Sequence, residues 1–275
     1  MKKVLVTGAY GMLGKDLCPI LENNNYYVVE TDVDIMDITS TASIEKIFSL
    51  EKPDIVIHCA AYTNVDKAEE DLETARHINA KGTENIAKAC HKYNATMVYI
   101  STDYVFDGQG NEPYKPTDKI APLNNYGLTK WEGEEVVRNN LEKYYICRTS
   151  WLYGHHGKNF VETMISLANK PELKVVDDQV GCPTWTTDLS EAIVKIIETK
   201  PYGTYHTCGG GSTSWYGFAK EIFVQAGLNV NLKPCTTDEF PRPAKRPAYS
   251  IMDNDGLLRD WKQALKSYMA MRVEV

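Results

Sequence analysis

Short runs rich in β-branched and aromatic residues alternate with longer amphipathic stretches over the first 150 of the 275 residues. This alternation limits the fold more than any other feature of the chain. The expected strands are KKVLVTG, YYVVET, DIVIHCA, TMVYIS and YYICRTS, and the expected helices between them span residues 12–23, 43–50, 71–93 and 128–139. Strands separated by helix-length segments need crossover connections, so they pair in parallel under helices on both faces. The sequence therefore predicts an α/β fold with a doubly wound parallel sheet.

The second half of the chain has a looser pattern. Helical periodicity appears at residues 160–169, 186–199, 215–226 and 260–271, and loops containing proline and glycine separate these stretches. Such a pattern does not extend the strand and helix alternation of the first half. We expect residues 1–150 to form the main domain and residues 151–275 to form mainly a smaller α/β cap that binds substrate, with some segments returning to the main domain.

Three glycines stand where the first expected strand ends and the first expected helix begins. The stretch TGAYGMLG places Gly8, Gly11 and Gly14 at intervals of three residues. The first would allow a tight turn, the second would let the backbone approach a pyrophosphate, and the third would let the helix lie close to the sheet. Free N–H groups and the dipole at the helix start favour an anion there. This pattern predicts that residues 1–150 form a dinucleotide-binding Rossmann domain, and the alternative is a glycine-rich turn selected only for packing.

Acidic residues after the second expected strand bear on the choice of cofactor. Asp32 follows YYVVET, where its carboxylate would accept hydrogen bonds from an adenosine ribose. Asp34 and Asp37 come next, and no lysine or arginine occurs before Lys46. This acidic rim would repel a 2′-phosphate, so the sequence favours NADH over NADPH. Exposed aspartates at a strand end are also often merely solvated.

A tyrosine and a lysine lie four positions apart in NNYGLTKWEGEE, at the start of an expected polar helix. Side chains at this spacing lie side by side on a helix, so Tyr126 and Lys130 can approach a common point. The preceding strand leaves Ser101, Thr102 and Asp103 at its carboxyl end, where open parallel sheets bind ligands. A hydroxyl, a phenol and a cation suit the reduction of a carbonyl. A nearby ammonium and an oxidised nicotinamide would both lower the pKa of Tyr126.

Eight stretches together resemble the extended short-chain dehydrogenase/reductase superfamily and, more closely, its family of dTDP-4-dehydrorhamnose reductases. They are GAYGMLG, CAAYTNVDKAE, INAKGTENIA, YISTDYVFDG, PLNNYGLTKWEGE, RTSWLYG, NFVETM and DQVGCPT, and the similarity runs over about the first 250 residues. The sequence departs from the family pattern at one place, because the chain is shorter before Trp261. The packing of the carboxyl terminus is therefore left open.

The resemblance implies a reaction, in which NAD(P)H reduces the C4 ketone of dTDP-4-dehydro-L-rhamnose, a dTDP-4-keto-6-deoxyhexose, to dTDP-L-rhamnose. Tyr126 would be the proton donor, and the catalytic set would be Thr102, Tyr126 and Lys130, with Lys130 also holding the nicotinamide ribose. The choice of Thr102 over Ser101 rests on the resemblance. It further implies cofactor contacts from Gly11, Met12, Leu13, Asp32, Asp37, Ile38, Ala61, Tyr62 and Thr63, and substrate contacts from Thr102, Asp103 and Trp151.

Three further features have a structural and a functional interpretation. An indole after a strand, such as Trp151, is more often a core residue than a ligand contact. Asn79 would brace the sheet or a water molecule, or would simply be exposed in a helix. The loop FPRPAKRPAYS, residues 240–250, places three cations among three prolines. It is either a solvated loop or a diphosphate contact, and the family element R-P-x-x-S matches Arg246 within it.

Composition excludes several classes of function. With 30 basic and 37 acidic residues the formal charge is −7, so no basic footprint for nucleic acid exists. Seven cysteines without a C-x-x-C pair suggest reduced, mostly buried thiols, and no signal or membrane segment is expected. We therefore expect a cytoplasmic protein. The histidines lack neighbours at ligand spacing, so no metal site is predicted, although the family suggests a homodimer with Mg²⁺ at its interface.

Two other functions remain open. The first is another reaction on a sugar nucleotide, namely dehydration or epimerisation. Similar dehydratases follow the threonine at the strand end with Asp and Glu, whereas STDY places Tyr104 where that Glu would stand. A phenol is a poor base for a carbon acid, so dehydration is disfavoured. The second is a cofactor-binding regulatory subunit without turnover, against which the intact set of Thr102, Tyr126 and Lys130 argues.

Overall fold

A six-stranded parallel sheet forms the centre of the protein. The structure is a computed structural model and describes residues 1–272. The strand order is β10-β5-β4-β3-β1-β2, and all five pairings are parallel. The strands are β1 (Lys3–Thr7), β2 (Tyr27–Thr31), β3 (Ile55–His58), β4 (Thr96–Thr102), β5 (Tyr144–Thr149) and β10 (Gly203–His206).

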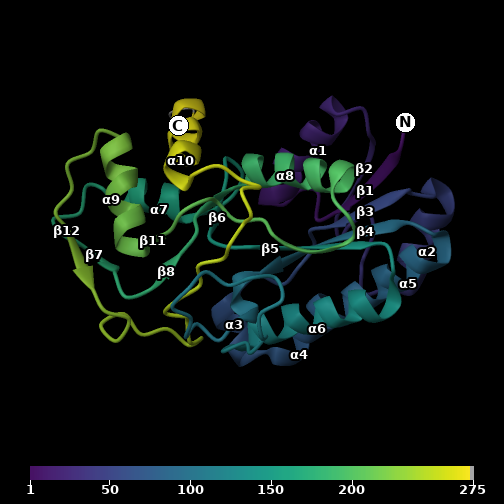
Figure 1. The fold of residues 1–275 in the computed structure, drawn as a ribbon, viewed down its shortest axis with the longest axis horizontal. Coiled ribbons are helices and arrows are strands. Elements are labelled where there is room, and N and C mark those ends of the chain that lie inside the picture. Colours follow the sequence, from purple (N-terminus) through teal and green to yellow (C-terminus); the bar gives the residue numbers. More distant parts are fainter. Residues whose placement is uncertain (273–275) are drawn as a thin grey trace.

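Helices cover both faces of this sheet (Figure 1). On one face lie α1 (Met12–Asn23) and α8 (Thr186–Thr199), and on the other lie α2 (Thr41–Glu51), α5 (Thr83–Tyr93) and α6 (Asn125–Asn140). Alternation along each strand divides the core, because successive side chains point to opposite faces. In β1, for example, Val4 and Val6 pack with α1 and α8, whereas Leu5 packs with α2 and α5. The predicted doubly wound α/β fold is confirmed.

The sequence located most elements and misplaced a few. The helix expected at 71–93 is interrupted: α4 (Leu72–Arg76) leads into a π-helical segment, η1 (His77–Gly82), before α5 begins. A further short helix, α3 (Val65–Glu70), precedes it. The strand β10 was also missed, because it has only four residues and follows the expected helix at 186–199 without a strand pattern of its own. With α8, it returns from the second half of the chain to the main sheet.

A second lobe lies beside the sheet and has its own core (Figure 1). Three helices carry most of that core: α7 (Phe160–Ser166), α9 (Trp215–Gln225) and α10 (Trp261–Met271). Its short strands pair as β6 (Leu152–Tyr153) with β9 (Thr184–Trp185), β7 (Leu173–Val176) with β12 (Leu232–Cys235), and β8 (Val180–Gly181) with β11 (Thr213–Ser214). Trp261, at the start of α10, is buried in this core, so the last helix is packed although the chain before it is shorter than the family pattern.

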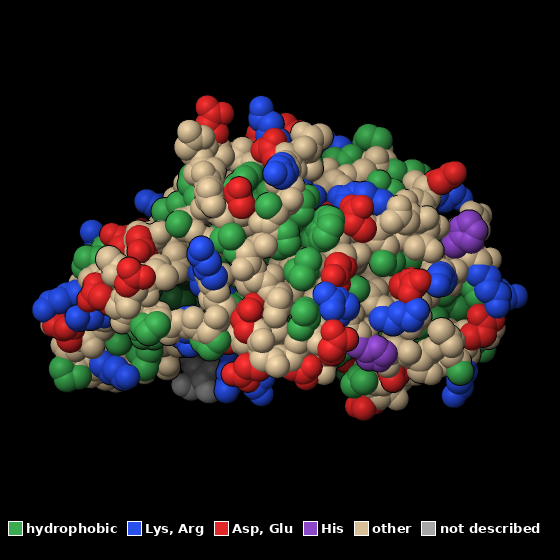
Figure 2. Space-filling view, turned by 90° about the horizontal axis from the view of Figure 1, so that it is seen from below, with side chains coloured by type: hydrophobic (Ala, Val, Ile, Leu, Met, Phe, Trp, Pro, Cys, Tyr) green, Lys and Arg blue, Asp and Glu red, His purple; other side chains and the backbone are tan. Residues whose placement is uncertain are grey.

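The charged side chains and the cysteines are distributed as the composition suggested. On the face shown in Figure 2, basic and acidic side chains are intermingled. All seven cysteines are free, and six of them are buried, in agreement with the thiols expected from the sequence. Over residues 1–272, every helix is too short or too polar to span a lipid bilayer.

Candidate active site

A large cleft opens at the carboxyl ends of β1, β3, β4 and β5, beside the second lobe. Its volume is about 1190 Å³, which exceeds the range of about 300–1,000 Å³ common for small-ligand sites and suits two nucleotide-sized ligands. Residues from every one of these strand ends line it, as the topology of an open parallel sheet requires: Thr7, Gly8, Cys59, Ala60, Ser101, Thr102, Thr149 and Ser150.

The glycine turn at the base of the cleft is sterically demanding. Gly8 has a φ of +64°, and a Cβ on it would lie 2.8 Å from the backbone nitrogen of Ala60, so a side chain is excluded there. A Cβ on Gly14 would lie 2.5 Å from the Cα of Ala9, because α1 packs directly on the turn. Gly11 is the N-cap of α1 and supplies no side-chain cap. The uncapped first turn of α1 therefore offers N–H groups beside the cleft, a cradle that fits a phosphate.

Aspartates line the far end of the cleft, as the sequence predicted. Asp32 accepts hydrogen bonds from the backbone nitrogens of Val33, at 2.8 Å, and Tyr10, at 3.2 Å. Asp37 accepts from Thr39, and these hydrogen bonds hold its pKa below the ordinary value. Asp34 is exposed and does not line the cleft. Among the lining residues that the structure describes, Lys130 is the sole lysine or arginine.

Asn79 is buried and braces one wall of the cleft, so it is not the exposed helix residue that was one of the alternatives. Only 1% exposed, it accepts from the nitrogen of Tyr62 at 2.8 Å and donates to the carbonyl of Tyr62 and to Thr129. Its place in the π-helical segment η1 explains the inward direction, since one additional residue in a turn rotates the helix face. Of the expected cofactor contacts, Ala61 and Thr63 line the cleft, whereas Tyr62 is held against Asn79 instead.

Thr102 and Asp103 lie together at the end of β4 and line the cleft. Thr102 donates to a carboxylate oxygen of Asp103 at 3.0 Å and accepts from the nitrogen of Tyr104. Burial raises the pKa of Asp103 to about 6, against hydrogen bonds from Ser250 and Thr102 that lower it. The expected catalytic hydroxyl of Thr102 therefore adjoins a carboxyl group whose pKa lies close to neutral pH.

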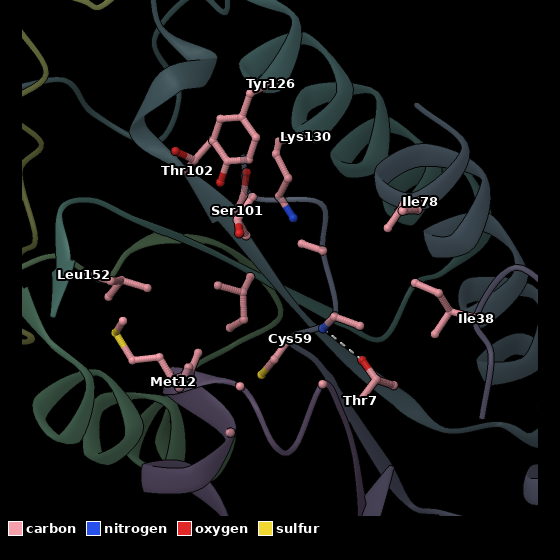
Figure 3. A pocket seen from close by; sticks show the side chains of 18 of the residues that line it. Thr7, Met12, Ile38, Cys59, Ile78, Ser101, Thr102, Tyr126, Lys130 and Leu152 are labelled. Carbon is pink, nitrogen blue, oxygen red and sulfur yellow. Dashed lines mark hydrogen bonds between the residues drawn. The ribbon is translucent and has the colours of Figure 1, made fainter. Parts of the chain in front are cut away.

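Tyr126 and Lys130 project from the first turns of α6 into the same cleft (Figure 3). In that view they lie with Thr102 on one side of the cleft, and Met12 lies across from them. Lys130 is 3% exposed, and its Nζ lies 4.1 Å from the ring centroid of Tyr99. The spacing of four residues thus brings the phenol and the cation to one wall, as expected.

Burial dominates the ionisation of both groups. It raises the pKa of Tyr126, and the hydrogen bond with Thr102 only partly offsets the shift. It lowers the pKa of Lys130 to about 7, although the charge of Glu134 acts in the opposite direction. The side chains of the protein alone therefore do not produce the lowered pKa of Tyr126 that the sequence suggested, because desolvation is the largest influence on this phenol.

Trp151 is a cleft residue rather than a core residue alone. It follows β5 with a left-handed φ of +48° and lines the cleft together with Trp215 of the second lobe. The two indoles are stacked, with ring centroids 3.6 Å apart and planes 6° from parallel. No pattern in the sequence indicated Trp215, because it comes from a helix 64 positions further along the chain. Together they form an aromatic wall between the lobes.

Arg246 lies outside the lining of the cleft. Its guanidinium donates to Asp66 on α3 at 2.9 Å and to the hydroxyl of Tyr104 at 3.4 Å. Arg242 approaches the same carboxylate at 4.0 Å, and the carbonyl of Lys245 accepts from Asn124. The loop of residues 240–250 is thus fastened to the main domain at the edge of the cleft.

Within residues 1–272, His, Cys, Asp and Glu side chains do not gather in groups of three or more that could hold a metal ion. The cleft instead combines a phosphate cradle with a phenol, a lysine and a hydroxyl at the end of a parallel strand. These features define a nicotinamide-dependent oxidoreductase of the short-chain dehydrogenase/reductase class.

Comparison with known proteins identifies the family within this class. A family model described as the RmlD substrate binding domain matches residues 1–273. The dTDP-4-dehydrorhamnose reductase of Aggregatibacter actinomycetemcomitans is 40% identical, with 98% of this chain and 99% of that protein covered. The chain therefore belongs to the dTDP-4-dehydrorhamnose reductase family, as its motifs indicated.

Two crystal structures show the same fold. A dTDP-4-dehydrorhamnose reductase from Clostridium acetobutylicum has a TM-score of 0.95 and 49% identity, with 98% of this chain and 99% of that chain covered. The enzyme of the same name from Bacillus anthracis, in complex with NADP, has a TM-score of 0.95 and 44% identity over 99% of this chain and 100% of that one. The fold and the oxidoreductase class predicted from the sequence are confirmed.

Proposed function

We propose that the protein reduces the C4 ketone of dTDP-4-dehydro-L-rhamnose to give dTDP-L-rhamnose. The single observation that carries this proposal is the arrangement of Thr102, Tyr126 and Lys130 in the cleft that also contains the glycine turn. The name of the relatives supports the choice of substrate. A nicotinamide cofactor, when bound, supplies hydride to the carbonyl carbon.

The residues of the chain would manage the proton and the orientation. Tyr126 donates its phenolic proton to the C4 oxygen as that oxygen becomes an alkoxide, which is far more basic than a phenolate. Because burial raises the pKa of Tyr126, the phenol is protonated at neutral pH, as a donor must be. Thr102 orients the ketone through its hydroxyl, while Asp103 and Trp151 contact the substrate. Lys130 contributes positive charge that stabilises the phenolate left after transfer.

For the cofactor, we propose contacts from the glycine turn and helix start, from the second strand end and from the loop after β3. The residues are Gly8, Gly11, Met12, Leu13, Asp32, Asp37, Ile38, Ala61, Tyr62 and Thr63, with Tyr126 and Lys130 at the nicotinamide end. Eleven of these twelve line the cleft, and Tyr62 is the exception.

The main test is turnover with a matched pair of tyrosine variants. Wild-type protein mixed with dTDP-4-dehydro-L-rhamnose should consume NADH or NADPH stoichiometrically, measured as loss of absorbance of the reduced cofactor. Tyr126→Phe should lower kcat by roughly 10²–10⁴-fold, the usual contribution of general acid catalysis, with cofactor binding retained. Tyr104→Phe removes a second phenol from the cleft and should lose far less. An inert wild type with either cofactor would reject the proposal.

We further propose that NADH is preferred. Asp32 at the end of β2 and the lack of a lysine or arginine near it in the described lining support this preference, since a 2′-phosphate would meet like charge. The relative from Bacillus anthracis binds NADP, so the preference needs its own test. Asp32→Asn should raise the ratio of kcat/KM with NADPH to that with NADH. A wild-type ratio in favour of NADPH would contradict the preference.

The remaining expectations also stay proposals. Residues 151–275 would act mainly as the substrate-binding cap, with α8 and β10 belonging to the main sheet, and Arg246 would contact the diphosphate after leaving Asp66. We expect a dTDP-sugar as the substrate, no nucleic-acid or membrane partner, a cytoplasmic location, and a homodimer with Mg²⁺ only if its interface supplies ligands. Sedimentation of the protein with and without Mg²⁺ tests the last point.

The same assay separates the alternative functions. An epimerase or dehydratase would convert a sugar nucleotide without net oxidation of the cofactor, and a regulatory subunit would bind cofactor without turnover. Comparing dTDP-4-dehydro-L-rhamnose with other dTDP-4-keto-6-deoxyhexoses identifies the preferred deoxysugar.

A further inference from the structure

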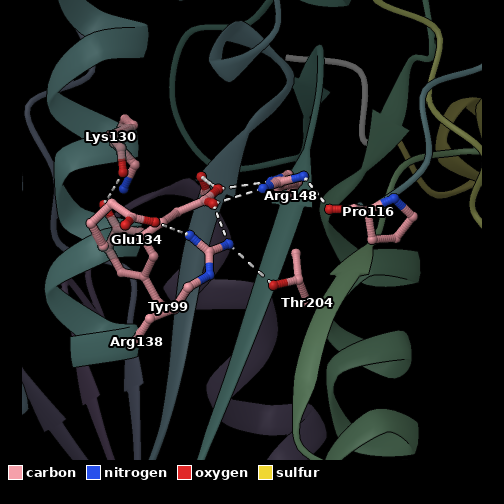
Figure 4. A network of polar contacts seen from close by, with 9 residues as sticks. Tyr99, Pro116, Lys130, Glu134, Arg138, Arg148 and Thr204 are labelled. Atoms are coloured by element: carbon pink, nitrogen blue, oxygen red, sulfur yellow. Dashed lines mark hydrogen bonds and ion pairs between the residues drawn. The ribbon is translucent and has the colours of Figure 1, made fainter. Parts of the chain in front are cut away.

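A buried ionic network lies one turn along α6 from Lys130, on the helix that also carries Tyr126 (Figure 4). Its centre is Glu134, whose carboxylate is fully buried. Arg148, itself 1% exposed, binds both carboxylate oxygens at 2.8 Å through Nε and Nη2. Arg138 donates to the same carboxylate at 2.8 Å, and the hydroxyl of Ser101 donates to it at 2.6 Å. One carboxylate thus joins three elements of the main domain.

Those three elements include the two that carry the proposed catalytic set. Glu134 lies on α6 one turn after Lys130, Ser101 precedes Thr102 on β4, and Arg148 is on β5. Arg148 also donates to the carbonyl of Pro116 at 3.1 Å. A buried carboxylate held by a two-pronged guanidinium fixes geometry well, because both groups lose hydration unless they stay paired.

Through Glu134, the network also acts on the ionisation of Lys130, because that carboxylate raises a pKa that burial lowers. The groups facing Lys130 are Glu134 and Tyr126 on α6, Tyr99 on β4, and His58 and Cys59 at the end of β3. Burial lowers the pKa of His58 to about 3 and raises that of the Cys59 thiol, so both are neutral near pH 7. Around Glu134 itself, Arg148 and Arg138 are cationic, and His206 on β10 is neutral because burial lowers its pKa to about 4.

We propose that Glu134 is a positioning residue for the reduction, which fastens the helix bearing Tyr126 and Lys130 to the strand bearing Thr102 and supplies a negative charge that favours the cationic form of Lys130. This inference rests on the proposed function for its kinetic consequence. Its structural part, the effect of Glu134 on the ionisation of Lys130, does not depend on the substrate.

The experiment measures the titration of Lys130 directly in the full chain. Protein labelled with ¹³C at the lysine Cε is titrated by NMR with and without NAD⁺, and the Lys130 signal is assigned with Lys130→Arg. Glu134→Gln should lower the midpoint by about one pH unit, the order expected for losing one charge at i,i+4 spacing in a medium of effective dielectric near 20. Arg138→Gln removes a cation from the network and should raise it.

Glu135→Gln is the matched control. Glu135 is the next residue on α6, half-exposed, and its ion pair is with Arg138, so its removal should leave the midpoint of Lys130 unchanged. An unmoved or raised midpoint in folded Glu134→Gln overturns the proposal. If Glu134→Gln does not fold, an unmoved midpoint in Arg138→Gln overturns it, since that guanidinium is partly exposed and its removal leaves Glu134 paired with Arg148.

Kinetics separate this proposal from the proposed function. The fall of kcat at alkaline pH should begin at lower pH in Glu134→Gln and at higher pH in Arg138→Gln, with Glu134→Asp restoring the wild-type limb by keeping the charge. A wild type that turns over no ketone rejects the proposed function, while the NMR midpoints still decide the role of Glu134. Normal turnover with unshifted midpoints and pH limbs rejects the positioning role alone.

Discussion

A pair of glycine substitutions in the turn before α1 should separate folding from cofactor binding. A Cβ on Gly14 would lie 2.5 Å from both the Cα of Ala9 and the carbonyl oxygen of Gly8. Ordinary contacts of such atoms begin near 3.4 Å, so α1 and the turn would have to separate by about 1 Å. At Gly11 the nearest atom is the oxygen of Gly8, at 3.2 Å, and φ is −75°, so an alanine fits the backbone.

The two changes therefore have different expected costs. Gly14→Ala strains a packed helix and should destabilise the protein by about 3 kcal/mol. For a chain of this size that corresponds to a fall in Tm of roughly 5 °C. Gly11→Ala should cost below about 1 kcal/mol, but its methyl group would occupy the approach of the diphosphate. Its affinity for NADH should fall at least about tenfold, or 1.4 kcal/mol.

Thermal unfolding without cofactor, followed by circular dichroism, measures the first effect, and quenching of protein fluorescence by NADH measures the second. The reasoning about the turn would be refuted if Gly14→Ala melted within about 1 °C of wild type, well below the shift expected for strain of that size. It would equally be refuted if Gly11→Ala bound NADH with unchanged affinity.

Two further substitutions test buried polar groups of the cleft. Burial raises the pKa of Asp103 from 3.8 to about 6, so stability that the wild type has below pH 4 is lost as pH rises through 6. Asp103→Asn should consequently be more stable than wild type at pH 7.5 by up to about 3 kcal/mol, with no gain at pH 4. Urea unfolding measures the free energy of unfolding of both proteins across this range. A difference in that free energy that did not change with pH would contradict the shift. Asn79→Ala breaks three hydrogen bonds to Tyr62 and Thr129 and should destabilise the protein by about 1–3 kcal/mol. It should also raise KM for NADH more than it changes kcat. A variant as stable as wild type would show that water replaces those bonds.

Much of the main domain could be predicted from periodicity because its signals are local. The bounds of α1 and α8 match the expected ranges at 12–23 and 186–199, since each helix carries one apolar stripe and a clear boundary. The π-helical segment at His77–Gly82 could not be predicted, because its insertion of one residue is stabilised by contacts of Asn79 with a distant loop. The sequence thus located the helix but not the direction of its polar residues.

The candidate site divides in the same way. Gly8, Asp32, Tyr126 and Lys130 were expected at the cleft, which they line, because they follow strands or open a helix, and parallel strands bring those positions to one edge. Thr102 also lines the cleft, but its choice over Ser101 came from the family resemblance. Trp215 was missed, since only the docking of the second lobe places its ring on Trp151. The direction of the pKa shift of Tyr126 was missed because desolvation depends on the surrounding packing, which a spacing of four residues does not describe.

The sequence by itself determined the parallel sheet, the glycine turn and the strand ends at which the cleft forms, because hydrophobic period and backbone sterics act over a few neighbouring residues. Only the tertiary structure decided the pairing of Glu134 with Arg148, the ion pair of Arg246 with Asp66 and the lowered pKa of Lys130. The two ion pairs join residues 14 and 180 positions apart in the chain, and the shift of Lys130 is caused first by burial. Charge and hydration in a folded interior are set by what packs around a group, and that is a property of the whole fold.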